Sequence, residues 1–237
     1  MSTIKRRVTL VKGEEEHGVA DSDFRKPVLL MGFKVALYSL LLFTLTEIIL
    51  LDAQRISNQF SEQSYTEYTQ EFFLLVSTVL FYLSVRYFPN QAVVGLLLGG
   101  LLGMSLIREF DAFFDTHVSR HTWKVLAYSL AILTAFQVYK HKDFFWRQLE
   151  AFIHTKAFGI IIAGMLTLFI FSRLYGLEHI WLALMGEEKY MYEIRRASEE
   201  SIELLGYTLI MIGAIEYLLD LNTSPKKKSN LDSIIIQ

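Results

Sequence analysis

The stretch GLLLGGLLGMSLIREFDAFFDTHVSRHTW, Gly95–Trp123, decides the fold class and holds the densest group of ionisable side chains in the sequence. Its first half is apolar and carries Gly95, Gly99 and Gly103 at four-residue spacing. About 20 mostly apolar residues cross the hydrocarbon layer as a helix, so this half predicts a membrane span. The second half ends the span in seven ionisable residues: Arg108, Glu109, Asp111, Asp115, His117, Arg120 and His121. We therefore expect this helix to deliver charges to one membrane face.

The composition of the whole chain agrees with a multi-pass membrane protein. Of its 237 residues, 52% are hydrophobic and 20% are charged, whereas soluble domains average roughly 45–50% and about 25%. The chain contains no cysteine, which excludes disulfides, a thiol nucleophile and cysteine-based metal sites. Phosphate-binding loops, dinucleotide fingerprints, zinc fingers and nucleic-acid-binding motifs are missing from the sequence, so we expect no nucleic-acid partner.

Six segments are long and apolar enough to cross a bilayer, which predicts an all-α, polytopic integral membrane helical bundle with six transmembrane helices. The predicted spans are 28–51, 71–88, 91–110, 123–140, 157–175 and 201–221. Residues 1–26 form a polar tail without the apolar core of a cleavable signal. Residues 27–221 form the transmembrane domain, and residues 222–237 form a basic tail.

The distribution of basic residues orients the bundle. With the N-terminus inside, 15 of the 23 lysine and arginine residues fall on inner segments and 8 on outer segments. Basic residues favour the cytoplasmic side, so both termini are predicted to be cytoplasmic. All three prolines and all three tryptophans fall at or near span edges, as this topology expects. The chain is expected in a bacterial inner membrane or another cell membrane, with membrane lipids as its neighbours.

Acidic residues from four predicted spans then fall at the outer membrane face. Glu47 and Asp52 close the first span, and Glu67 and Glu71 open the second. The third and sixth spans contribute a larger set: Arg108, Glu109, Asp111, Asp115, Glu199, Glu200 and Glu203. If the third helix continues far enough, Arg108, Asp111 and Asp115 share one face, because they are spaced i, i+3 and i+7.

This convergence predicts a cation site. Facing carboxylates repel one another unless a guanidinium, a shared proton or a metal ion lies between them. Carboxylates together with imidazoles suit hard or borderline divalent metal ions, so a divalent metal is one expected cofactor. The predicted metal ligands are Glu47, Asp111, Asp115, His117, His121, Glu199 and Glu203. The predicted catalytic residues are Arg108, Glu109, Asp111, Asp115 and Glu203.

Each of these signals has a plainer explanation. Acids at span ends meet water and headgroups, and acids at a helix start also complement its dipole, which gives Glu199 and Glu200 a structural role. An ion pair between Arg108 and Asp111 would lock the third span without chemistry. The glycines of the third span predict close helix packing, and Gly206 and Gly213 predict the sixth span as its partner.

Three functions remain open. The first is a proton or divalent-metal site at the outer face that supports hydrolytic or redox chemistry on a lipid-like substrate. The second is an accessory or scaffold subunit of a membrane complex, or a homo-oligomer, with structural ion pairs. The third is a proton or ion transporter, for which the polar residues inside the spans are few. Whether the protein is an enzyme is left undecided by the sequence.

Overall fold

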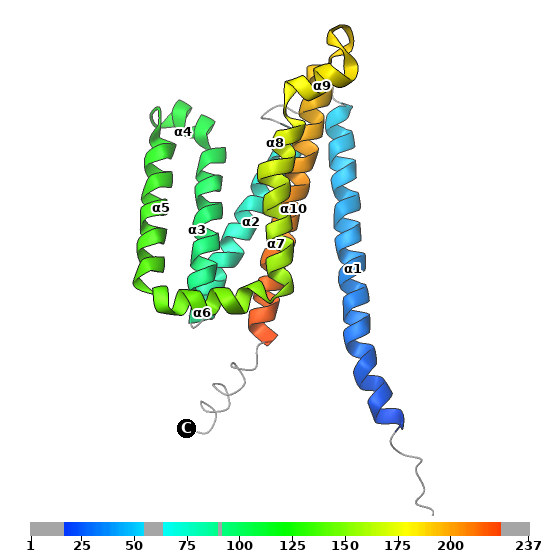
Figure 1. The fold of residues 1–237 in the computed structure, drawn as a ribbon, viewed down its shortest axis with the longest axis vertical. Coiled ribbons are helices and arrows are strands. Elements are labelled where there is room, and N and C mark those ends of the chain that lie inside the picture. Colours follow the sequence, from blue (N-terminus) through cyan, green and yellow to red (C-terminus); the bar gives the residue numbers. More distant parts are fainter. Residues whose placement is uncertain (1–16, 55–63, 90–91, 224–237) are drawn as a thin grey trace, which may run out of the picture. The chain divides into compact units, whose positions relative to one another are not determined.

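A computed structural model of the chain describes residues 17–54, 64–89 and 92–223, and all its regular elements are helices (Figure 1). The all-α prediction is confirmed for these residues. The chain divides into two units, Met1–Thr46 and Glu47–Gln237, and each is described by itself.

Helix α1 (His17–Ala53) makes up the described part of the first unit and continues into the second. It begins well before the predicted span 28–51 and carries Pro27 inside the helix. Hydropathy marks only the apolar length of a helix, whereas the helix itself continues into polar sequence, which explains the difference. Residues 1–16 of the predicted N-terminal tail and 224–237 of the C-terminal tail lie outside the described residues.

The second unit is built around the pair formed by α2 and α10. Helix α2 packs against α3 and α10, α3 packs also against α5, and α10 packs also against α7 (Figure 1). The elements after α1 are α2 (Tyr65–Tyr87), α3 (Ala92–Glu109), α4 (Asp111–His117), α5 (Thr122–Lys140), α6 (Lys142–Ile153), α7 (Lys156–Leu166), a π-helical turn (Thr167–Phe171), α8 (Ser172–Tyr175), α9 (Glu178–Met185), a 3-10 turn (Glu187–Lys189) and α10 (Tyr192–Thr223).

Four helical segments among the described residues are long and apolar enough to cross a membrane. They are Arg25–Ala53, Tyr65–Tyr87, Lys156–Tyr175 and Tyr192–Asn222. These four overlap the predicted first, second, fifth and sixth spans. Helices α3 and α5 lie on the predicted spans 91–110 and 123–140, but with 18 and 19 residues they are shorter and do not belong to the four.

Buried apolar side chains fill the contacts that α10 makes with its neighbouring helices. Leu74 and Phe81 of α2 and Leu204 and Ile210 of α10 are almost fully buried. The ring of Phe81 also contacts the ring of Tyr217, with centroids 5.6 Å apart. In a bilayer, dispersion contacts of this kind hold helices together, because lipid tails are as apolar as the side chains.

Glycines allow close contacts between helices, but the helices that they join are not the predicted pair of the third and sixth spans. Gly164 of α7 meets the backbone of α10: a Cβ atom there would lie 2.9 Å from the carbonyl oxygen of Gly206 and from the amide nitrogen of Ile210. Gly95 of α3 instead lies against Ser84 of α2. The predicted glycine-mediated pairing of the third and sixth spans is therefore wrong, since each glycine row already faces a different helix.

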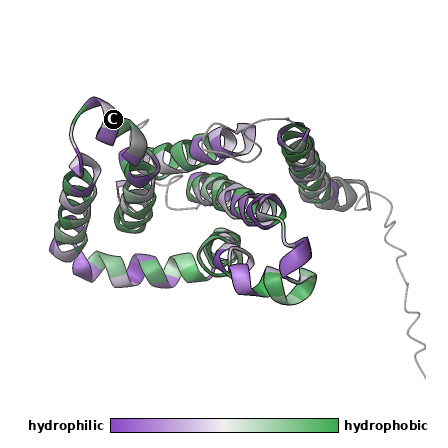
Figure 2. Ribbon diagram, turned by 90° about the horizontal axis from the view of Figure 1, so that it is seen from above, coloured by the Kyte–Doolittle hydropathy of each residue, from purple (hydrophilic) through white to green (hydrophobic). Residues whose placement is uncertain are grey.

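Helix α6 runs crosswise between α5 and α7 and alternates hydrophilic and hydrophobic residues along its length (Figure 2). Phe144 and Trp146 on it are exposed. The side-chain oxygen of Gln148 accepts a hydrogen bond of 2.9 Å from the N–H of Val93. That N–H belongs to the first turn of α3, where no intrahelical acceptor is available, so α6 caps α3.

Candidate functional site

Ten charged side chains gather around the start of α2, the end of α3, helix α8 and the first four turns of α10. We call this group the Glu–Arg cluster and define it by interactions among the described residues. Its members are Glu67, Glu71, Arg108, Glu109, Arg173, Arg195, Arg196, Glu199, Glu200 and Glu203. The cluster lies at the end of the unit opposite α6 (Figure 1).

The link between α2 and α10 passes through Gln70 and Glu200. The amide nitrogen of Gln70 donates to both the backbone oxygen and the carboxylate of Glu200, each at 3.0 Å. Both side chains are buried. The same carboxylate lies 3.8 Å from Arg196, one helical turn earlier. A buried amide that meets a charged acceptor makes a strong and directional contact, so this pair holds the two helices in register.

The link between α3 and α10 passes through Glu109. The hydroxyl of Tyr207, which is buried on α10, donates to a carboxylate oxygen of Glu109 at 3.2 Å. The same oxygen lies 2.8 Å from the guanidinium of Arg108. Glu109 thus joins the end of α3 to α10.

The third link comes from Arg173, which follows the π-helical turn at Thr167–Phe171. Its guanidinium lies 3.3 Å from Glu199 and 3.4 Å from Glu203. These acids are one turn apart on α10, so a single cation bridges them. The π turn starts next to the close contact between Leu168 and Gly206. A π turn holds one more residue than the corresponding stretch of α-helix. The residues after it, including Arg173, therefore face a different direction from the one they would face if the α-helix were continuous.

Gly176, which follows α8, contacts two members of the cluster. Its carbonyl oxygen accepts a hydrogen bond of 2.6 Å from Arg195. The carboxylate of Glu199 lies so close to the α-carbon of Gly176 that a Cβ atom would overlap it. Glycine at this position therefore lets the carboxylate lie directly against the backbone.

The carboxylates on α10 lie deeper than Arg108 and Arg173, whereas Arg195 and Arg196 are themselves only 19% and 28% exposed. The side chains of Glu199, Glu200 and Glu203 are 18%, 12% and 15% exposed, whereas those of Arg108 and Arg173 are 53% and 58% exposed. Within the cluster as defined, six glutamates face four arginines. The cluster as defined therefore carries more negative than positive charge.

Glu67 on α2 lies near three other carboxylates of the cluster. Burial withdraws Glu67 from water, and it also lies near Glu200 and Glu203 on α10 and near Glu109 on α3, with Arg196 as the cation that offsets their repulsion in part. Glu71, one turn further along α2, is also repelled by Glu109. Both glutamate side chains are only partly exposed, so water screens this repulsion incompletely.

The predicted site residues divide into two groups. Arg108, Glu109, Glu199 and Glu203 belong to the cluster. The others that follow α3 lie on α4 or just after it, and all are exposed or partly exposed: Asp111, Asp115, His117 and His121. The helix stops at Phe110, whose ψ of 17° leaves the helical range, so the expected common face of Arg108, Asp111 and Asp115 does not form.

The α4 residues have local partners instead. A carboxylate oxygen of Asp115 accepts the backbone N–H of His121 at 3.0 Å, which supports a turn where His121 has a φ of +70°. The imidazole of His117 stacks on Phe113, with centroids 4.6 Å apart. These local contacts hold Asp115 and His117 in place at the surface.

The first helix contributes little to the expected site. Glu47 is exposed on α1. Asp52 is fully buried, but it accepts the backbone N–H groups of Tyr65 and Thr66 at 3.0 and 2.7 Å and so caps the start of α2. Among the described residues, no three His, Asp or Glu side chains come together closely enough to hold a metal ion, so the predicted metal site has no support in the structure.

Sequence reasoning placed Glu67, Glu71 and Glu200 at the same end of the bundle as the other acids but did not select them as site residues. It missed Gln70, Arg173 and Gly176 entirely. Gln70 and Glu200 are 130 residues apart, and a single sequence carries no signal that pairs them. The four-residue spacing of Glu199 and Glu203 indicates that one cation can face both acids. Nothing in the sequence identifies that cation as Arg173.

Comparison with known protein families, curated proteins and solved structures found no match for this chain.

Proposed function

We propose that the protein is a multi-pass membrane protein whose Glu–Arg cluster binds a cation, and that this cation is a proton shared among carboxylates. The observation that carries the proposal is the make-up of the cluster: six glutamates face four arginines, and the carboxylates of Glu199, Glu200 and Glu203 are 12–18% exposed. Glu67 is partly buried and lies close enough to carboxylates on α3 and α10 to interact with them. A proton bound between carboxylate oxygens relieves such repulsion without new ligands. Ionisable groups at membrane depth are costly, which favours a role in function for them.

A proton fits the cluster better than a divalent metal. Metal ions of this class need several oxygen or nitrogen ligands around one point, and the described residues do not offer three together. A proton needs only two facing oxygens. Hydrolytic or redox chemistry on a lipid-like substrate would have to rely on Glu109 and Glu203 beside Arg108, because Asp111 and Asp115 lie on α4, away from the cluster.

Infrared spectroscopy of the purified protein tests the proton directly, because protonated carboxyl groups and carboxylates absorb at different frequencies. We expect a protonated-carboxyl band near neutral pH in the wild type, and we expect Glu67→Gln to remove it. Glu187→Gln is the matched control, since Glu187 is an exposed acid in the 3-10 turn after α9. Identical spectra for wild type and Glu67→Gln would overturn the proposal.

The proposal includes a six-span topology with both termini in the cytoplasm, in a bacterial inner membrane or another cell membrane. Helices α3 and α5 are about 27–29 Å long at 1.5 Å per residue, close to the hydrocarbon thickness. The apolar side chains of Ile132, Leu133 and Phe136 on α5 are 69%, 61% and 61% exposed, which favours contact with lipid. The distribution of lysine and arginine favours the stated orientation.

Single-cysteine labelling tests this topology on a clean background, because the chain has no cysteine of its own. We expect a membrane-impermeant thiol reagent to label Ser119→Cys, in the turn before α5, from outside the cell. It should label Lys142→Cys, at the start of α6, only after the membrane is opened. The reverse pattern would place the Glu–Arg cluster on the cytoplasmic side.

An accessory or scaffold role is the second candidate, and the links among the helices favour it. Glu200, Glu109 and Arg173 each connect α10 to a different element. A network of this kind stabilises a bundle without binding a ligand. Stoichiometric co-purification of a partner subunit, or a defined homo-oligomer, together with no infrared signal from Glu67 would favour this candidate.

Transport of protons or ions is the remaining alternative. The interface of α2 and α10 contains buried hydroxyls, but those of Ser77, Thr78 and Thr208 donate to carbonyls in their own helices at 2.6–2.8 Å. Their protons are thus engaged locally. A proton path would have to reach buried Glu216 further along α10. Proton flux into proteoliposomes that Glu216→Gln abolishes would favour transport.

A further inference from the structure

Helix α6 lies at the end of the second unit opposite the Glu–Arg cluster, and its sides differ in character (Figure 1). One side faces the bundle: Phe145, Leu149 and Phe152, spaced i, i+4 and i+7, are partly or fully buried. The ring of Phe152 contacts the ring of Tyr217 on α10, with centroids 5.4 Å apart. The protein itself therefore occupies this side of the helix.

The opposite side of α6 is charged, and the two flanks between these sides are apolar. Asp143, Arg147 and Glu150 repeat the same spacing two residues earlier, which places them about 200° around the helix from the buried side. All three are exposed. Phe144 lies on one flank and Trp146 on the other, and their side chains are 60% and 67% exposed. Large apolar side chains are thus exposed on both flanks.

The direction of α6 places these flanks at a membrane surface. Helix α6 runs crosswise to α7, which begins the membrane-spanning segment Lys156–Tyr175 (Figure 1). A helix that lies across the end of a span lies in the plane of the membrane–water interface. Amphipathic helices in this plane place aromatic side chains at the boundary between headgroups and acyl chains. The flanks of α6 then face lipid, and its charged side faces water.

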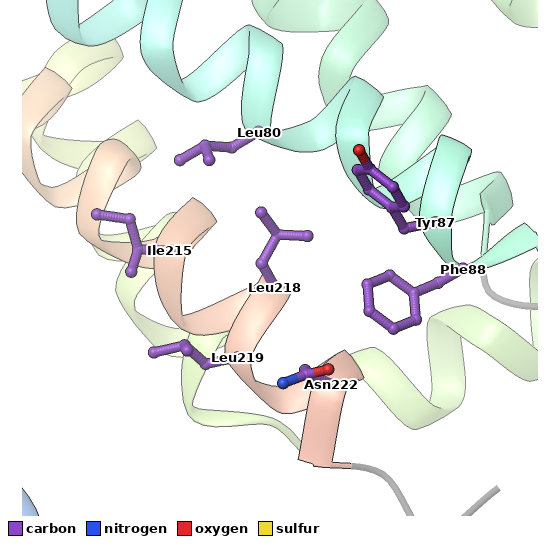
Figure 3. A pocket seen from close by; sticks show the side chains of 7 residues that line it. All are labelled: Leu80, Tyr87, Phe88, Ile215, Leu218, Leu219 and Asn222. Atoms are coloured by element: carbon purple, nitrogen blue, oxygen red, sulfur yellow. The ribbon is translucent and has the colours of Figure 1, made fainter. Parts of the chain in front are cut away.

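Basic residues outnumber acidic ones along α6 and at its two ends. Between residues 140 and 156 the acids are Asp143 and Glu150, and the bases are Lys140, Lys142, Arg147 and Lys156. Each base is exposed, and none makes an ion pair with a described residue. The groove between α2 and α10 at the same end differs, because apolar and aromatic side chains and Asn222 line it without any charge (Figure 3). The positive charge on and beside α6 therefore complements anionic headgroups.

We propose that α6 is an interfacial helix that gathers anionic phospholipids around it. The bases on α6 and at its ends meet the phosphates, and Phe144 and Trp146 lie where headgroups give way to acyl chains. Through Gln148, which accepts the N–H of Val93, the same helix fixes the start of α3. This role of α6 rests on the proposed function only for its membrane-spanning segments, and not for the proton near Glu67.

Tryptophan fluorescence of the full chain, in bilayers of phosphatidylcholine and phosphatidylglycerol, tests this role. Trp123→Phe with Trp181→Phe, or the corresponding tyrosine variants if these do not fold, leaves Trp146 as the only tryptophan of the chain. Bromine atoms on the acyl chains of one of the two lipids quench a tryptophan that they contact. We expect brominated phosphatidylglycerol to quench Trp146 at least about twofold more strongly than brominated phosphatidylcholine at equal mole fraction. Equal quenching by the two lipids would overturn the proposal.

Removing charge from α6 separates a local preference from the charge of the whole chain. In the same background, Lys142→Gln with Arg147→Gln should bring the quenching ratio towards one, while brominated phosphatidylcholine still quenches. Arg120→Gln with Lys189→Gln is the matched control, because it removes two exposed bases at the opposite end, and it should leave the ratio unchanged (Figure 1). An equal fall in the ratio for both pairs would contradict a preference located at α6.

A tryptophan on the charged side of α6 distinguishes an interfacial helix from one that another protein covers. Trp146→Phe with Arg147→Trp, in the same background, moves the indole from the flank to the side that faces water. We expect acrylamide in the aqueous phase to quench it more strongly than brominated lipids do. If neither acrylamide nor brominated lipid quenches Trp146 in its native position, protein covers the flank, such as a second copy of the chain, and the proposal fails. Neither result depends on Glu67→Gln, which tests the proton by itself.

Discussion

Two acid-rich regions lie at the same end of the second unit, and they differ in what surrounds them. The α4 segment holds Asp111 and Asp115 with two histidines, and the contacts described for Asp115 and His117 are local. The Glu–Arg cluster holds carboxylates that are 12–22% exposed and bonds them to other helices. The comparison teaches that the density of acids along a sequence matters less than whether neighbouring helices supply partners.

Gly164→Leu should have the largest effect, because it separates the helices that carry the cluster. The new side chain would meet the backbone of Gly206 and Ile210, which cannot move without shifting α7 away from α10. Overpacking of this kind costs about 3 kcal/mol in the free energy of unfolding. Thermal unfolding in detergent would measure it as a large fall in the midpoint. Gly159→Leu is the control on the same helix, since a Cβ atom at Gly159 would meet nothing within 4 Å.

Glu200→Ala should come next. It removes the carboxylate from Gln70 and Arg196, both of which are at least partly buried, and an unsatisfied buried polar group costs about 1–3 kcal/mol. Glu200→Gln keeps an acceptor for Gln70 and should recover part of the loss. The thermal midpoints of the three proteins should therefore rank wild type, Glu200→Gln, Glu200→Ala. Equal midpoints for both variants would show that the link to Gln70 contributes nothing.

Gly176→Ala should have a smaller effect of about 1 kcal/mol, the lower end of the range for overpacking. Its methyl group would displace the carboxylate of Glu199, which is the end of a flexible side chain and can move. The displacement weakens the ion pairs of Glu199 with Arg173 and Arg195. If Glu199→Ala is already present, Gly176→Ala should cost less, and a double-mutant cycle of unfolding free energies measures the difference. Simple additivity would contradict the proposed contact.

Asp115→Ala should have the smallest effect, within about 0.5 kcal/mol, because its side chain makes a local contact with His121 at the surface. It should also leave the infrared signal expected from Glu67 unchanged. A loss of stability as large as that from Glu200→Ala would remove the distinction between the two regions. Circular dichroism during thermal unfolding is sufficient for this measurement.

The sequence alone predicted the all-helical fold and the position of most helices, since apolar length and composition determine both. It also predicted that Glu199, Glu203, Glu109 and Arg108 meet at one end. It placed Asp111 and Asp115 with them because it could not see the helix stop at Phe110, where no glycine or proline marks a break. The partners that distinguish the two regions, Gln70 and Arg173, come from distant segments and have no local signature.

The π-helical turn at Thr167–Phe171 makes the spacing of this segment matter more than its side chains. The turn accommodates one extra residue, so removing one residue would let an ordinary α-helix run through with everything beyond facing as before. Straightening the turn into an α-helix without a deletion would instead rotate everything beyond by about 100°. Arg173 would then face away from Glu199 and Glu203 although every contact residue remained in the chain. Substitutions among the apolar residues of this turn should be tolerated, and so should a single-residue deletion that removes the turn, whereas a change that straightens the turn at constant length should turn Arg173 away from its two acids.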